Sequence, residues 1–379
     1  MLENGTVYHV YKGIDGADQA GRQLAKGKDV LQHRGCHSPL NLVNMEEIAP
    51  HLDIVFVDVY PGWQLGQYEH EYILPFIACL AGSLTDWKVW LVLGGHMIRN
   101  HYEARFQEIR TWSRQVLDQG VEAPGWFALD YIRCSDRYNA VGLLASLSSP
   151  ESWKALLNIS CRAAKEEVKS ISPSIYAMVF PHNSILSFYD HIPFPMPYGI
   201  LVPLVGFDLW YVSDNRISED QKALKGHQYL FTTPSCQMRK KLVDRLLTFA
   251  KNGGSLIVSS DDFAVDEQMR AMDARKELLG ISEEEQFCDA DTIEIVQDME
   301  ALTAGTKLNS YWNRIRVKEL AEGSQVIERW SDSTPAIFKR PFGKGQVIHI
   351  GTIPYWAALY PERNEGWMQF FPIVVFEAS

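Results

Sequence analysis

Two acidic residues stand where apolar runs of the sequence come to an end. Asp58 lies near the end of the run Asp53–Val59, and Asp130 closes the run Gly125–Asp130. Such runs are typical of buried strands in a parallel sheet, and the ligands of these sheets bind beyond the carboxyl ends of the strands. Two carboxylates at one edge could act as acid and base on a glycosidic bond, so Asp58 and Asp130 are the catalytic candidates.

Polar and aromatic residues at the same predicted strand ends suit a carbohydrate ligand. Aromatic faces pack on the apolar face of a sugar ring, while imidazole and charged groups form hydrogen bonds with its hydroxyls. The substrate-binding candidates are Arg34, His37, Tyr60, Trp63, His96, Trp126 and Tyr131. A structural alternative stays open, in which Asp58 and Asp130 cap helices or pair with Arg34 or Arg133.

Two further patterns resemble a metal site and a phosphate-binding loop, but each lacks essential residues of such a site. His33, Cys36 and His37 lie close together, but no second ligand pair has the spacing of a metal site, so no metal is predicted. Gly343-Lys344-Gly345 lacks the upstream glycine, the Ser or Thr and the following helix of a phosphate loop. It is predicted to be a hairpin turn, and no cofactor is expected.

Cys236 stands after a predicted strand and before a predicted helix, where a nucleophile could be placed. Its context, Pro-Ser-Cys-Gln-Met, lacks the Gly-x-Cys-x-Gly pattern of a strained elbow, and no partner histidine is evident. The sequence therefore favours a buried or rim thiol. An amidotransferase-like hydrolase that uses Cys236 stays as the weaker alternative.

A repeated order of strand, loop and helix would position the candidate residues. Each strand–loop–helix repeat is roughly 35–45 residues long, which is typical of a (β/α) barrel or an open α/β sheet. The predicted strands and helices of this region are Val7–Tyr11, Ala17–Leu24, Asp29–His33, Asp53–Val59, Tyr68–Leu84, Lys88–Leu93, Glu103–Asp118, Gly125–Asp130 and Ser152–Lys169.

After a linker at Ser172-Pro173-Ser174, the pattern begins again around the segment Tyr229–Ser260. Its apolar residues have helical spacing between two β-prone runs, and Gly253-Gly254 supplies the helix stop, so it predicts a βαβ unit with parallel strands. The other expectations for this half are strands at Ile175–Phe180 and Phe207–Val212, a helix at Tyr198–Val205, a helix at Asp266–Leu279, an exposed acidic connector at Ser282–Gln286, a hairpin of Pro335–Arg340 with Val347–Gly351, and a tail from Tyr360 without clear period.

Composition excludes several partners. A formal net charge of −11 and a pI near 5.5 argue against nucleic acid and anionic membranes as ligands. The six cysteines are widely spaced and form no CxxC pair, which is typical of free thiols in a reducing compartment. Without a signal-peptide pattern or a long apolar run, a cytoplasmic protein is expected.

Three segments carry a resemblance to a known family: "PYGILVPLVGFDLWYVSD", "YLFTTPSCQMRKKLVDRLLTFAKNGGSLIVSS" and "GKGQVIHIGTIP". The region from about Ile175 to Pro354 resembles the β-galactosidase trimerisation domain of family 42 glycoside hydrolases, a flavodoxin-like domain related to class I glutamine amidotransferases. The region from about Asp29 to Lys169 is similar to the second half of the family's catalytic barrel. There, "LDIVFVDVYPGW", "KVWLVLGGH" and "APGWFALDY" are similar to the sixth, seventh and eighth strands.

The resemblance implies a retaining glycosidase with a Glu acid/base after strand four and a Glu nucleophile after strand seven. In this sequence the segment similar to strand seven ends in Gly94-Gly95-His96, without a carboxylate. About four or five strands precede the linker, whereas a closed barrel needs eight. Two interpretations stay open: the C-terminal part of a longer glycosidase, or a degenerate relative that uses other residues or only binds.

The expected fold is therefore α/β, with a partial or degenerate (β/α)8 barrel-like region at 1–171. A flavodoxin-like, glutamine amidotransferase-like doubly wound domain is expected at 172–357, and a tail at 358–379. The expected function is that of a glycoside-hydrolase-like protein that acts on or binds a carbohydrate. The alternative is a non-catalytic oligomerisation or carbohydrate-binding module. From the resemblance, the partner is a second copy of the chain, in a homo-oligomer that would be a trimer.

Overall fold

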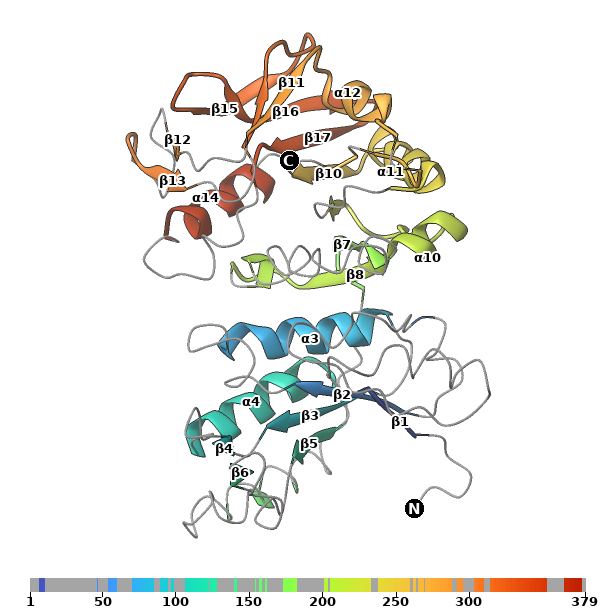
Figure 1. Cartoon of the computed structure of the whole chain (residues 1–379), viewed down its shortest axis with the longest axis vertical. Coiled ribbons are helices and arrows are strands. Elements are labelled where there is room, and N and C mark those ends of the chain that lie inside the picture. Colours follow the sequence, from blue (N-terminus) through green and yellow to red (C-terminus); the bar gives the residue numbers. More distant parts are fainter. Residues whose placement is uncertain are drawn as a thin grey trace. The chain divides into compact units, whose positions relative to one another are not determined.

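The protein was analysed as a computed structural model of the 379-residue chain. The structure describes residues 7–10, 46, 54–59, 70–84, 89–94, 97–98, 106–121, 123–127, 140–141, 154, 157–158, 161, 173–182, 201–203, 205–232, 238–259, 262–263, 265–268, 270–287, 292–295, 303–309, 314–352 and 365–376. The chain divides into two compact units, Met1–Ser172 and Pro173–Ser379, so the division falls within the predicted linker (Figure 1).

The first unit contains a parallel sheet in the order β1-β2-β3-β5. Helix α3 follows β2 and helix α4 follows β3, which is the connection that parallel neighbours require. The elements are β1 (Val7–Val10), β2 (Ile54–Val59), α3 (His70–Leu84), β3 (Val89–Gly94), β4 (Met97–Ile98), α4 (Phe106–Asp118), β5 (Ala123–Phe127) and β6 (Ala140–Val141). A small antiparallel pair of β4 and β6 stands apart from this sheet.

Apolar periodicity explains how the helices of the first unit attach to its sheet. Leu74, Ile77 and Leu80 of α3 are buried, as are Trp112 and Val116 of α4. Each set repeats every three or four residues, so it forms one helical face. Helix α3 contacts β3 and α4 contacts β5 and α3 (Figure 1). The predicted positions of β2, β3, α3 and α4 are confirmed to within three residues.

The second unit is built on a nine-stranded mixed sheet in the order β13-β12-β15-β16-β17-β10-β9-β7-β8. The five strands β17, β10, β9, β7 and β8 are parallel, and the others are antiparallel. The strands of the sheet are β7 (Tyr176–Phe180), β8 (Leu209–Ser213), β9 (Tyr229–Phe231), β10 (Ser255–Ser259), β12 (Thr292–Glu294), β13 (Lys307–Asn309), β15 (Gln325–Trp330), β16 (Pro335–Phe342) and β17 (Gly345–Ile350).

Helices cover both faces of this sheet, and a separate strand pair lies beside it. The helices are α10 (Asp214–Glu219), α11 (Lys240–Lys251), α12 (Asp273–Leu279) and α14 (Glu365–Phe376), and the pair is β11 (Glu284–Phe287) with β14 (Arg314–Val317). Alternate strand residues such as Leu230 and Leu256 share one core with Leu242 and Leu246 of α11. On β9 the next residue, Phe231, stacks instead on Phe371 of α14, with ring centroids 5.7 Å apart.

The predicted βαβ unit is confirmed as β9, α11 and β10, with Ser255 paired in register with Tyr229. The helix ends at Asn252, and Gly253 follows with φ +117°. The predicted hairpin is confirmed as β16 and β17 around Gly343-Lys344.

Three local predictions for the second unit were wrong. The helix expected over Asp266–Leu279 is only α12, because the Asp266 carboxylate accepts the backbone N–H groups of Gln268 and Arg270 at 2.8 and 2.9 Å and so holds a turn. The expected acidic connector at Ser282–Gln286 contains β11, which pairs with β14. The tail without clear period contains the buried helix α14.

Candidate functional site

Asp58 and Trp126 both lie near the carboxyl edge of the first unit's sheet. Asp58 is the fifth of six residues of β2, and Trp126 is the fourth of five residues of β5. Both strands pair with β3, where Asp58 is in register with Val92 and Trp126 with Leu93. Their backbones are therefore separated by two strand spacings, about 10 Å. The two residues share this edge but stand one register position apart on β3. Because successive positions along a strand alternate between the two faces of a sheet, Asp58 and Trp126 belong to opposite faces.

The other predicted site residues lie outside the described residues. The described part of β5 is Ala123–Phe127, whereas the expected strand was Gly125–Asp130. The residues outside the description are Arg34, His37, Tyr60, Trp63, His96, Asp130 and Tyr131. Within the described ranges, no group of three His, Cys, Asp or Glu side chains is arranged to hold a metal ion.

A buried polar cluster fills part of the carboxyl edge of the second unit's parallel strands. Asp262, which is fully buried, accepts hydrogen bonds from the Thr232 hydroxyl and, at 3.0 Å, from the backbone N–H of Ser259. Arg275 donates to the backbone carbonyl of Asp262 and pairs with Glu284 at 2.8 Å. These bonds satisfy groups that burial would otherwise penalise, so the cluster is structural. Sequence reasoning missed it because its members come from four separate segments.

His349 adds a titratable group to the buried interior near this cluster. It is fully buried in β17, and its ring lies 4.9 Å from that of Phe338. Burial, with a smaller contribution from the Arg275 guanidinium, holds the pKa of His349 well below its usual value of 6.5. The ring is therefore neutral in the folded protein at neutral pH. Cys236, the nucleophile candidate in the same half, lies outside the described residues.

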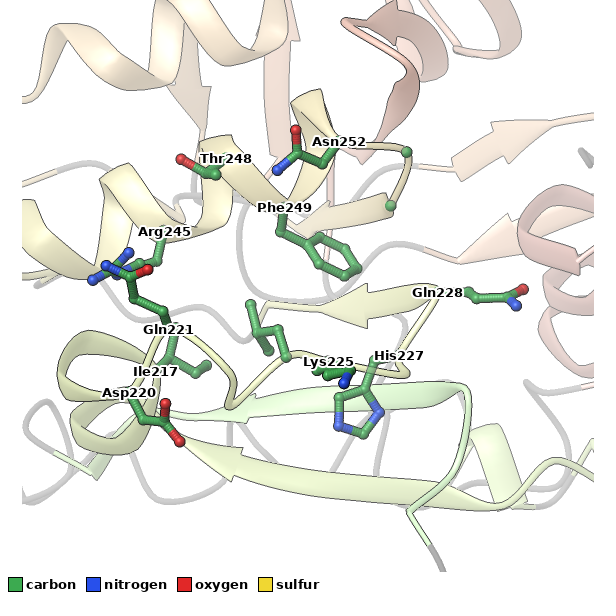
Figure 2. Close-up of a pocket in the computed structure, with 13 residues that line it drawn as sticks. Ile217, Asp220, Gln221, Lys225, His227, Gln228, Arg245, Thr248, Phe249 and Asn252 are labelled. Carbon is green, nitrogen blue, oxygen red and sulfur yellow. The ribbon is translucent and has the colours of Figure 1, made fainter.

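A pocket of about 490 Å³ lies at the opposite edge of the second unit's parallel strands, next to the amino ends of β9 and β10. Figure 2 shows helix α11 above it and the chain between α10 and β9 below it. No sequence pattern pointed to this pocket, because its residues are separately unremarkable. They are Ile217, Asp220, Gln221, Leu224, Lys225, His227, Gln228, Arg245, Thr248, Phe249, Asn252, Gly253 and Gly254.

Two α/β units, the first with a parallel sheet and the second with a larger mixed sheet, place the chain among α/β proteins with a glycoside-hydrolase-like fold. A family model described as "Beta-galactosidase trimerisation domain" matches residues 215–365. Residues 215–365 are therefore similar to this domain, and the fold of the chain is similar to that of GH42 beta-galactosidases.

Solved structures support this assignment at the level of the fold. A GH42 beta-galactosidase from G. stearothermophilus, in a catalytic-mutant form, is 17% identical with a TM-score of 0.65; the match covers 83% of this chain and 48% of that one. The beta-galactosidase from Bacillus circulans sp. alkalophilus is 14% identical with a TM-score of 0.68; the match covers 89% of this chain and 51% of that one. The beta-galactosidase from Halorubrum lacusprofundi is 16% identical with a TM-score of 0.69; the match covers 88% of this chain and 53% of that one.

The chain thus spans about half the length of these structures. A comparison with curated protein sequences gives no match. Among the described residues, no helix is both long and apolar enough to cross a membrane.

Proposed function

We propose that the protein binds a glycoside at the carboxyl edge of the first unit's sheet and acts on it with Asp58 and Asp130 as the acid/base pair. The observation that carries the proposal is the placement of Asp58 and Trp126 at one edge of a parallel sheet. The GH42-like fold supports the same substrate class. Because the three similar enzymes described above are named beta-galactosidases, a β-galactoside is the first ligand to test.

The remaining candidates have defined roles in this proposal. Trp63, Trp126, Tyr60 and Tyr131 would pack on the sugar ring, whereas Arg34, His37 and His96 would form hydrogen bonds with its hydroxyls. One carboxyl group of the pair would donate a proton to the leaving oxygen, and the other would act as base or nucleophile. A separation of roughly 5–10 Å between the two carboxyl groups is needed for this chemistry.

Hydrolysis is tested by incubating the full chain with aryl β-galactoside and aryl β-mannoside and by following thermal shifts with the free sugars. If Asp58 takes part, Asp58→Asn lowers the rate at least about 100-fold, the usual contribution of a general acid or base. Asp53→Asn, at the other end of the same apolar run, serves as the matched control and leaves the rate unchanged. An unchanged rate in Asp58→Asn would remove this residue from the mechanism.

The absence of both cleavage and a sugar-induced thermal shift would favour the second candidate function, a non-catalytic assembly module. The match of residues 215–365 to a trimerisation domain supports this alternative. The order of the five parallel strands supports a flavodoxin-like domain: by appearance in the chain it reads 2-1-3-4-5 for β8, β7, β9, β10 and β17. A barrel-like first domain, a trimeric assembly and a cytoplasmic location are parts of the same proposal.

A further inference from the structure

The pocket beside α11 is positioned to serve as a binding site of its own. Open α/β sheets bind their usual ligands beyond the carboxyl ends of the strands. This pocket instead lies at the amino ends, because Gln228 immediately precedes β9 and Gly254 immediately precedes β10. Its volume, about 490 Å³, is within the range of small-molecule sites. It is therefore distinct from the buried polar cluster described above and lies in the second unit.

Positive charge is concentrated in this pocket although the chain as a whole carries −11. Lys225 and Arg245 line it, and neither side chain makes a hydrogen bond or ion pair with any residue that the structure describes. Arg245 is half-buried, so part of its hydration is lost without a compensating partner. Asp220 is the single carboxylate in the lining, and its Oδ1 already accepts the backbone N–H of Lys222 at 2.8 Å. An anionic group would complement this charge.

His227 contributes to the pocket as a fixed and neutral ring. Its Nδ1 lies 2.5 Å from the backbone carbonyl of Ser174, so Nδ1 carries the proton and donates it. In the neutral ring Nε2 is then an acceptor, suited to a ligand hydroxyl. Burial lowers the pKa of His227, which is consistent with the neutral form.

The rest of the lining combines amides with an apolar wall. The side chains of Gln221 and Asn252 each offer a donor and an acceptor, whereas the side chain of Gln228 points away from the other labelled residues (Figure 2). Phe249 belongs to the wall, and its ring lies against Gly254, where a Cβ would lie 2.3 Å from its Cε1 atom. Amides that face hydroxyls and an aromatic ring that faces an apolar sugar face are a general basis for recognition of a sugar ring.

We propose that this pocket binds a small anionic sugar, a hydroxylated ring that carries a carboxylate or a phosphate. The anionic group pairs with Arg245 and Lys225, and the hydroxyls form hydrogen bonds with the amides and His227. This binding does not require hydrolysis by the first unit. A failure of the hydrolysis test therefore leaves the proposal untouched, and a failure of the proposal leaves hydrolysis untouched.

Isothermal titration calorimetry of the full chain tests the site with galacturonate, galactose 6-phosphate, galactose and inorganic phosphate as separate probes. We expect one or both of the anionic sugars to bind at least about tenfold more tightly than galactose. A hydrogen bond to a charged group is more stabilising than a bond between neutral groups, and the difference in free energy corresponds to about a tenfold change in Kd. The preferred anionic sugar tells whether carboxylate or phosphate is recognised. Equal binding of galactose, or binding of inorganic phosphate as tight as that of either anionic sugar, would overturn the proposal.

Matched variants locate the binding to this pocket. Arg245→Gln and Lys225→Gln each weaken anionic-sugar binding about tenfold or more. Lys222→Gln is the control, because Lys222 is exposed and close in sequence but does not line the pocket. Unchanged thermal unfolding of all three variants confirms that each is folded. If the Arg245 and Lys225 variants bind as tightly as the unaltered chain, the pocket is not the site.

Discussion

At the scale of single residues, the polar side chains in the interior of the second unit are held by specific partners. Asp262 is the centre of this arrangement, since Thr232, Ser259 and Arg275 all donate to its side chain or backbone. A buried carboxylate without such donors would be strongly destabilising. Because these polar side chains are buried, their hydrogen bonds stabilise the fold, but the side chains cannot contact a ligand. This explains why chemistry at this edge is not part of the proposed function.

His349 makes the stability of the second unit depend on pH. In the unfolded chain its pKa is near 6.5, and in the folded protein burial and Arg275 lower it. Above about pH 7.5 both states are neutral and the residue has no effect. Below pH 6.5 the unfolded state takes up the proton first, so this residue lowers the free energy of unfolding as the pH falls from 7.5 to 5.5.

Urea denaturation at the two pH values measures this effect. His349→Leu removes the titrating group and should weaken this pH dependence of the unfolding free energy. His227→Gln is a useful comparison, because the pKa of this half-buried ring is also lowered and a smaller change is expected. An identical pH dependence in His349→Leu and the unaltered chain would contradict the prediction.

At the scale of elements, two glycine motifs that are about 90 residues apart in the sequence pack against each other. The end of α11 and the β16–β17 turn approach so closely that a Cβ at Gly345 would lie 2.2 Å from the carbonyl oxygen of Gly254. The backbone N–H of Lys344 also donates to the carbonyl of Lys251 at 2.9 Å. The hairpin turn thus satisfies a free carbonyl at the helix end.

Gly343→Ala should destabilise the second unit through both conformation and contact. Gly343 has φ +66°, and a Cβ there would lie 2.7 Å from the Cα and carbonyl oxygen of Lys251. Gly323→Ala is the matched control, because Gly323 has φ +81° but open space around it. Since overpacking adds about 1–3 kcal/mol to the conformational cost, Gly343→Ala should lose that much more unfolding free energy than Gly323→Ala. Equal losses in urea denaturation would show that the contact does not matter.

At the scale of the whole molecule, the proposed assembly gives a direct prediction. The region 215–365 is similar to a trimerisation domain, and a stable interface in a homo-oligomer commonly buries well over 1,000 Å². We expect size-exclusion chromatography with light scattering to give three times the chain mass of 43.1 kDa at micromolar concentration. The mass of a single chain at that concentration would contradict the trimer. A dimer would retain self-association but reject the threefold arrangement.

Local properties of the sequence were enough to predict several regular elements in both units. The apolar run at Asp53–Val59 and the amphipathic spacing within Glu103–Asp118 correspond to β2 and α4, and the segment Tyr229–Ser260 to a βαβ unit. The rule that ligands bind at the carboxyl ends of parallel strands also predicted a common edge for Asp58 and Trp126. These features depend on residues close together in the chain, so periodicity and turn residues reveal them.

The sequence by itself determined the α/β class, the βαβ unit and the resemblance to a trimerisation domain. Only the tertiary structure decided that Asp262 is a buried hydrogen-bond acceptor, that the tail contains α14, and that Lys225 and Arg245 line one pocket. Each of these features joins segments that are far apart in the chain or depends on what covers a side chain. Burial and pairing across such separations follow from packing of the whole unit, which no local pattern of residues encodes.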